Sequence, residues 1–183
     1  MSYFRLTLIL VLGAMSILMN IQPAYAASED LERQVISAYI FKFGNYITWP
    51  DNTFADSSSP IIIGIVEEES IANELETIAS GHLTGNRSVI IKKLNPQNMN
   101  TDVHILYVPS GATKLLTTYR NAHPGAATLY ITNTAAGLNS GGTINFVRDN
   151  NRLRFDVSLP AAEQNRIKLD ASLLTVTRQV LKE

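Results

Sequence analysis

Apolar residues follow two alternating patterns along most of the chain. Short runs rich in Ile, Val and Leu, with few polar interruptions, are typical of strands buried on both faces of a sheet. Between them, apolar residues recur every three or four positions, as on one face of a helix. The runs that predict strands cover residues 61–66, 88–94, 103–108 and 127–132, and the helical stretches cover 70–80 and 110–121. Strands that alternate with helices predict right-handed βαβ units and a parallel sheet.

The pattern changes after residue 142. Residues 143–147 and 153–158 alternate between apolar and polar side chains and flank a turn-forming Asp-Asn-Asn-Arg tetrapeptide, which predicts a β-hairpin. A last helix is expected over residues 170–181, with Asp170 as its N-cap. Together these elements predict one α/β domain, a three-layer sandwich with a mixed sheet of about six strands and an antiparallel C-terminal hairpin.

A longer helix is predicted before the first strand. Ser28 is its expected N-cap, because the acidic residues that follow suit the positive end of a helix dipole. The helical spacing continues to Tyr46, and Trp49-Pro50 is expected to close the segment because proline restricts the residue before it.

The first residues are typical of a cleavable signal peptide. Arg5 precedes an apolar run over residues 6–21, which is shorter than the roughly 20 residues that a membrane-spanning helix needs. The run ends at the small-x-small sequence Ala24-Tyr25-Ala26, where signal peptidase is expected to cleave after Ala26. The sequence thus predicts a signal peptide over residues 1–26, export from the cytoplasm and a mature domain over 27–183. An uncleaved membrane anchor is the alternative.

Composition removes several classes of protein. The chain has no cysteine, which excludes disulfides, a thiolate nucleophile and lipid attachment through cysteine. A net charge of −1 is not the basic footprint of a nucleic-acid-binding protein. His82, His104 and His123 lack the spacing of metal ligands, and His104, within a predicted strand, is expected to be structural. We find no nucleophile and base pair and no phosphate-binding loop, so neither catalytic residues nor a metal or cofactor is predicted.

Two groups of residues are candidates for binding a protein partner. The first group consists of aromatic residues on the N-terminal helix and just after it: Tyr39, Phe41, Phe43, Tyr46 and Trp49. Their side chains point in too many directions around the helix for all of them to face one core. Aromatic side chains anchor interfaces well, although burial on two sides of the helix is the alternative. The second group lies on the hairpin: Arg148, Arg152 and Arg154. Guanidinium groups can pair with the carboxylates of a partner. The alternative is that these arginines only face solvent and keep the edge of the sheet from pairing with another chain.

Several motifs occur together in the order of a known family. They are the run Ala38-Tyr39-Ile40-Phe41-Lys42-Phe43 followed by Trp49-Pro50, then Gly85-Asn86-Arg87, His104-Ile105-Leu106-Tyr107-Val108-Pro109-Ser110, and the hairpin with Asn150-Asn151-Arg152 and Phe155-Asp156. With these motifs, nearly the whole mature chain resembles the YfiR-like family of periplasmic proteins.

The resemblance implies a non-enzymatic periplasmic regulator. Its partner would be the periplasmic sensor domain of an inner-membrane diguanylate cyclase, which it would hold inactive, and an outer-membrane lipoprotein would relieve the inhibition. The protein would thereby control cyclic-di-GMP and biofilm formation. Because the family is broad, a sensor kinase or another membrane protein is also consistent with the resemblance. Independently of the resemblance, the aromatic flank of the N-terminal helix could contact a second copy of this chain. Redox control through disulfides, known in the family, does not transfer to a chain without cysteine.

Two other classes of function stay open at this point. A periplasmic protein that binds a small molecule for a receptor or transporter would also lack catalytic residues. A hydrolase is the least favoured, because no catalytic residues can be nominated.

Overall fold

The computed structural model describes residues 22–150 and 152–183. The chain divides into two units, residues 1–33 and 34–183, and the second contains the sheet. Helix α2 spans Gln22–Phe43. The expected N-cap at Ser28 is wrong for the full-length chain, because the helix begins before it. Most of the predicted signal peptide, up to residue 21, lies outside the described residues. Within the described residues no helix is long and apolar enough to cross a membrane.

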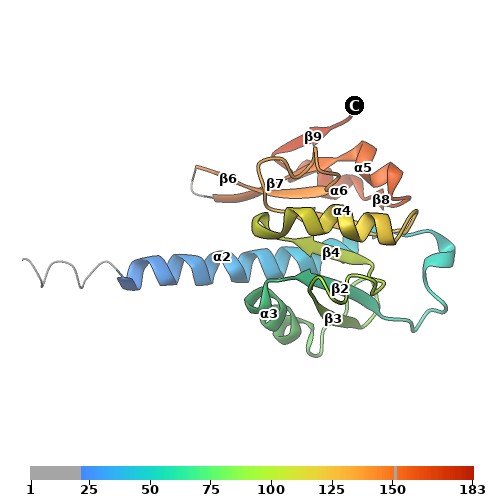
Figure 1. Cartoon of the computed structure of the whole chain (residues 1–183), viewed down its shortest axis with the longest axis horizontal. Helices are drawn as coiled ribbons and strands as arrows, with labels where there is room; N and C mark the ends of the chain where they lie inside the picture. The colour runs from blue at the N-terminus through green and yellow to red at the C-terminus, as the bar shows by residue number, and fades with distance from the viewer. Residues whose placement is uncertain (1–21, 151) are drawn as a thin grey trace, which may run out of the picture. The chain divides into compact units, whose positions relative to one another are not determined.

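A seven-stranded mixed sheet forms the centre of the second unit, with the order β3-β2-β4-β5-β6-β7-β9 (Figure 1). Its strands are β2 Ile61–Val66, β3 Val89–Leu94, β4 Ile105–Val108, β5 Leu129–Thr132, β6 Ile144–Asp149, β7 Arg152–Ser158 and β9 Gln179–Leu181. The strands β2 to β6 are parallel, and β7 and β9 run the opposite way. The predicted α/β class, βαβ units and hairpin are confirmed.

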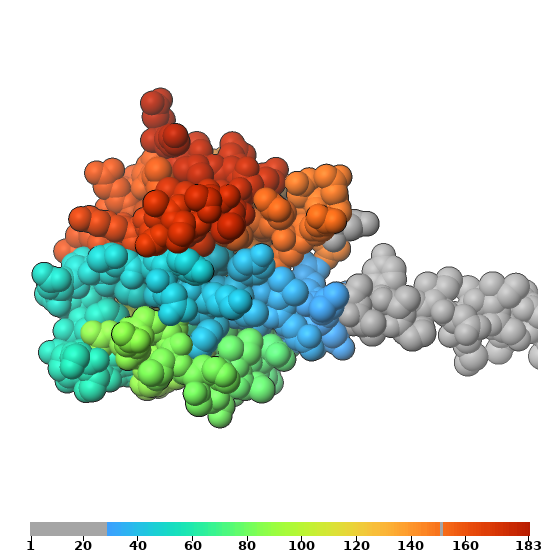
Figure 2. Space-filling view, turned by 180° about the vertical axis from the view of Figure 1, so that it is seen from behind, coloured from blue at the N-terminus to red at the C-terminus, as the bar shows by residue number. Residues whose placement is uncertain are grey.

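The segment that follows α2 differs from the prediction. The helix ends at Phe43 and a 3₁₀ turn, η2 Gly44–Tyr46, leads into β1 Ile47–Thr48. Strand β1 pairs with β8 Lys168–Leu169 in a separate two-stranded sheet. The following loop holds only the short turn η3 Asp51–Thr53. In Figure 2 residues near 40–60, in cyan, lie between the C-terminal elements in red and the green segment.

The C-terminal helix is shorter than predicted. Asp170 does cap α6 Ala171–Thr175, and its carboxylate accepts the N–H of Ser172 at 2.7 Å. The helix then stops at a run of β-branched residues, 175–177, which lose side-chain freedom in a helix. The chain continues as β9, where Val180 pairs with Val157 of β7, so the sheet has one strand more than expected.

Helices cover the sheet on both faces. The end of α2, α3 Glu69–Ala79 and α5 Leu159–Gln164 pack on one face, and α4 Thr113–Ala122, preceded by η4 Ser110–Ala112, packs on the other. Successive strand residues point to opposite faces, so Tyr107 joins the first core and Leu106 the second. Gly64 allows close packing beneath α4, because a Cβ there would lie 2.8 Å from a methyl group of Leu94.

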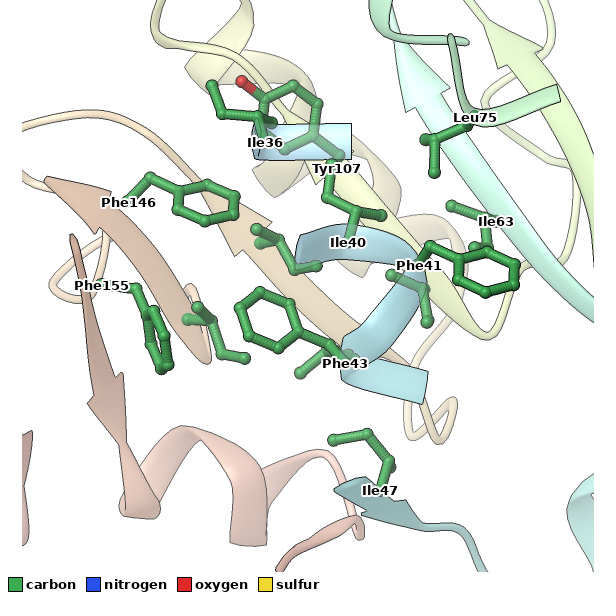
Figure 3. Close-up of a cluster of buried hydrophobic side chains, with 14 of the residues drawn as sticks. Ile36, Ile40, Phe41, Phe43, Ile47, Ile63, Leu75, Tyr107, Phe146 and Phe155 are labelled. Atoms are coloured by element: carbon green, nitrogen blue, oxygen red, sulfur yellow. The ribbon is translucent and has the colours of Figure 1, made fainter. Parts of the chain in front are cut away.

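Aromatic rings fill the core between α2 and the hairpin (Figure 3). Phe43, only 1% exposed, stacks on Phe146 with ring centroids 5.9 Å apart and meets Phe155 edge to face at 5.1 Å. Tyr39 adds a third contact with Phe155, at 5.6 Å. These contacts attach the end of the helix to the base of the hairpin.

Replacing Phe155 by Ala should lower the free energy of unfolding by about 3–5 kcal/mol, because a buried ring is lost and a cavity remains. The measurement is urea denaturation of the mature protein. Leu83→Ala is the control: Leu83 is 61% exposed, so its truncation should change stability by no more than about 0.5 kcal/mol. Equal losses in the two variants would contradict the described core.

Candidate functional site

The structure separates the five aromatic candidates. Phe41 and Phe43 are buried, with 8% and 1% of their surface exposed, so they belong to the core. Tyr39 and Tyr46 are half-buried and pack against the same core. Burial on two sides of the helix therefore accounts for most of this group.

Trp49 lies in a different aromatic group, at the loop that follows β1. Its ring meets Phe54 edge to face at 5.7 Å, and Phe54 stacks on His104 at 4.6 Å. The guanidinium of Arg87 covers the Phe54 ring at 3.9 Å and donates to the carbonyls of Asp56 and Ser59 at 2.8 and 2.7 Å. Stacking and hydrogen bonds thus hold a loop that has almost no regular structure of its own.

His104 is tied into the sheet by its ring. Its Nδ1 accepts the backbone N–H of Ile62 at 2.9 Å, so the neutral ring must carry its proton on Nε2. Burial lowers the pKa of His104, and the nearby positive charge of Arg87 lowers it further, against the opposing effects of Thr53 and Asp102. The Ile62 amide on Nδ1 and the stacked ring of Phe54 together hold the His104 ring in place.

A cleft of about 250 Å³ opens beside this histidine, at the amino ends of β2, β4 and β5. Its wall combines small apolar residues with polar groups: Asn52, Thr53, Ile62, Asp102, Val103, His104, Ala126, Ala127, Thr128 and Arg166. Arg166 donates to the carbonyl of Gly125, which fixes its direction. Within the described part of the chain, no three His, Asp or Glu side chains are grouped so as to hold a metal ion.

The three arginine candidates lie on the hairpin and are all exposed. Cross-strand pairs share a face, and Arg148 pairs with Leu153 whereas Arg154 pairs with Val147. Arg152 and Arg154 therefore project from one face and Arg148 from the other. The hairpin turn lies at the carboxyl ends of the parallel strands and the cleft at their amino ends, so the two surfaces lie at opposite ends of the sheet.

Sequence reasoning missed the group around Trp49. Phe54 was not singled out, and Arg87 was named only as part of the Gly85-Asn86-Arg87 motif, because it lies far along the chain from the loop that it holds. The signal available in the sequence was the Trp-Pro pair before a polar loop, which marked Trp49 but not its neighbours.

The fold is a mixed α/β domain with exposed arginines on the hairpin and half-buried aromatic rings beside the cleft. Residues 33–178 match the family described as YfiR/HmsC-like, DUF4154, and the chain belongs to this family. Members of the family are non-enzymatic periplasmic regulators in cyclic-di-GMP signalling.

Two solved structures show a weaker likeness. A conserved domain protein from Vibrio cholerae has 11% identity and a TM-score of 0.47, over 65% of this chain and 54% of that one. The ABC domain in complex with L-Trp from Streptococcus pneumonia has 14% identity and a TM-score of 0.48, over 66% and 55%. This chain thus spans about half the length of each. No curated protein matches it significantly.

Acidification should destabilise the protein partly through His104. Its pKa is lower in the folded state, so the unfolded chain binds the proton first as the pH falls below about 6.5. The stability contributed by the neutral ring is complete above that pH and is lost below it. Thermal unfolding from pH 7.5 to 5 should show a smaller loss for His104→Asn, whose Oδ1 also accepts the Ile62 N–H. Identical pH profiles for the variant and the wild-type protein would contradict this assignment.

Proposed function

We propose that this protein binds the periplasmic sensor domain of an inner-membrane diguanylate cyclase and holds the cyclase inactive. The mature protein, residues 27–183, acts after cleavage of a signal peptide behind Ala26. Repression lowers cyclic-di-GMP in the cytoplasm and thereby limits biofilm formation. An outer-membrane lipoprotein that sequesters the protein relieves the repression.

The observation that carries this proposal is the family match over residues 33–178, which includes nearly all of the sheet and the hairpin. Family members act by binding proteins in the periplasm rather than by catalysis. The chemistry of this chain is consistent with such a role. His104, a base candidate by residue type, has its Nδ1 occupied by a backbone amide.

The protein also offers surfaces that suit a protein partner. Arg152 and Arg154 are exposed on one face of the hairpin, and Trp49 is half-buried at the opposite end of the sheet. Arginine and aromatic residues are the side chains that most often carry binding energy at interfaces. A sensor kinase with an equivalent periplasmic domain is the alternative partner.

Deleting the gene should raise intracellular cyclic-di-GMP several-fold, and expression of the wild-type chain from a plasmid should restore the original level. Crosslinking in intact cells should in addition capture a cyclase through its periplasmic domain. As a control, residues 27–183 are secreted with a foreign signal peptide in the deletion strain. Restored cyclic-di-GMP levels would show that the native signal peptide serves only for export. If cyclic-di-GMP is unchanged and a sensor kinase is captured, the kinase replaces the cyclase as the partner. If cyclic-di-GMP is unchanged and no membrane protein is captured, the proposal is refuted.

A further inference from the structure

The β6–β7 hairpin continues beyond the strands beside it. Strand β6 pairs with β5 only at Ile144 and Asn145, and β7 pairs with β9 only from Asp156 onward. The segments 146–149 and 152–155 pair with each other along the β6–β7 ladder and form a two-stranded arm, at whose base the carbonyl of Phe155 accepts the N–H of Arg178 at 2.9 Å. Figure 1 shows this arm extending past the neighbouring strands of the sheet.

The base of the arm is firmly attached. On one face, Phe146 and Phe155 are buried beneath Tyr39 and Phe43. On the other face, the carboxylate of Asp156, which is 5% exposed, accepts two hydrogen bonds from Arg178, the one from Nε measuring 2.8 Å. An arm fixed on both faces at its base is preorganised, so binding through its tip costs little ordering entropy.

The tip of the arm is basic. Residues 146–155 include three arginines and Asp149 as the one acidic residue, whereas the whole chain has a net charge of −1. Arg152 and Arg154 lie two positions apart on the same strand, so they project from one face roughly 7 Å apart. Arg178 on the same side of the sheet is held by Asp156, and Asp149 shares this face because it pairs with Arg152 across the strands. The arginines Arg152 and Arg154 therefore outnumber the one acidic residue on the outer part of this face.

We propose that this arm inserts into a concave, acidic surface of the partner's periplasmic domain, with Arg152 and Arg154 paired to carboxylates there. The inference rests on the proposed function and names the chemistry of its interface. A protruding element requires a concave counterpart, and two guanidinium groups fixed on one face match carboxylates at a similar spacing. Half-buried Val147, directly opposite Arg154 on the paired strand, would meet the floor of that groove.

The arm is tested by charge reversal in the full chain. Arg152→Glu with Arg154→Glu should weaken capture of the membrane partner by roughly tenfold or more, because carboxylates then face carboxylates. The matched control, Lys92→Glu with Lys114→Glu, reverses two exposed cations on β3 and α4 and should leave capture within about twofold. Both variants should unfold at the wild-type temperature within a few degrees.

A photo-crosslinking residue at Asp149 then locates the contact. The expected product joins the arm to a segment of the partner that is rich in Asp and Glu, and reversing those carboxylates to Lys should restore binding of the Arg152→Glu, Arg154→Glu variant. Undiminished capture by this variant would overturn the inference and leave the proposed function standing. Arginine-dependent binding to phosphatidylglycerol vesicles without a protein crosslink would overturn it in favour of a lipid surface. Normal cyclic-di-GMP in the deletion strain would instead count against the proposed function itself.

Discussion

The packing of Phe43 against Phe146 and Phe155 is the contact on which the arrangement of this domain depends. It joins the end of α2 to a hairpin that lies more than a hundred residues later in the chain. It belongs to a larger core on this side of the sheet, in which α2 also buries Ile36, Ile40 and Phe41. Burying large aromatic side chains is the strongest source of stability that a domain without disulfides has available.

The same contact divides the hairpin into two parts with different roles. The base is buried and holds the sheet together, whereas the tip is exposed and carries charge. At the other end of the sheet, Phe54, His104 and Arg87 hold a polar loop closely against the strands. One end of the sheet therefore carries the stacked loop beside the cleft, and the other carries the arm.

The sequence predicted the sheet well, because runs such as 61–66 have no amphipathic alternative to a buried strand. It placed the hairpin correctly, since Asn150 accepts the left-handed backbone that a short turn needs (φ 47°). The prediction from sequence was wrong where residues far along the chain determine the structure of a segment. Residues 179–181 have helical spacing but become a strand, because the edge of β7 is open to them. Of the arginine candidates, the strand register separates Arg148 from the other two.

The aromatic candidates show the same limit. Their spacing indicated more aromatic surface than one helix face buries, but only the fold shows that α2 lies between α3 and the hairpin, where Phe41 and Phe43 are covered. Trp49 was marked by its place before Pro50, and its contacts come from residues that no local pattern connects to it.

The central claim is that the hairpin tip is the surface at which this regulator meets its partner. Hydrogen–deuterium exchange of the mature protein, alone and with the purified sensor domain, tests it most directly. The account predicts slower exchange of the amides in residues 147–154 upon binding, with the aromatic base already protected in the free protein. Protection that appears only around Trp49 and the cleft, with no change in the arm, would contradict it.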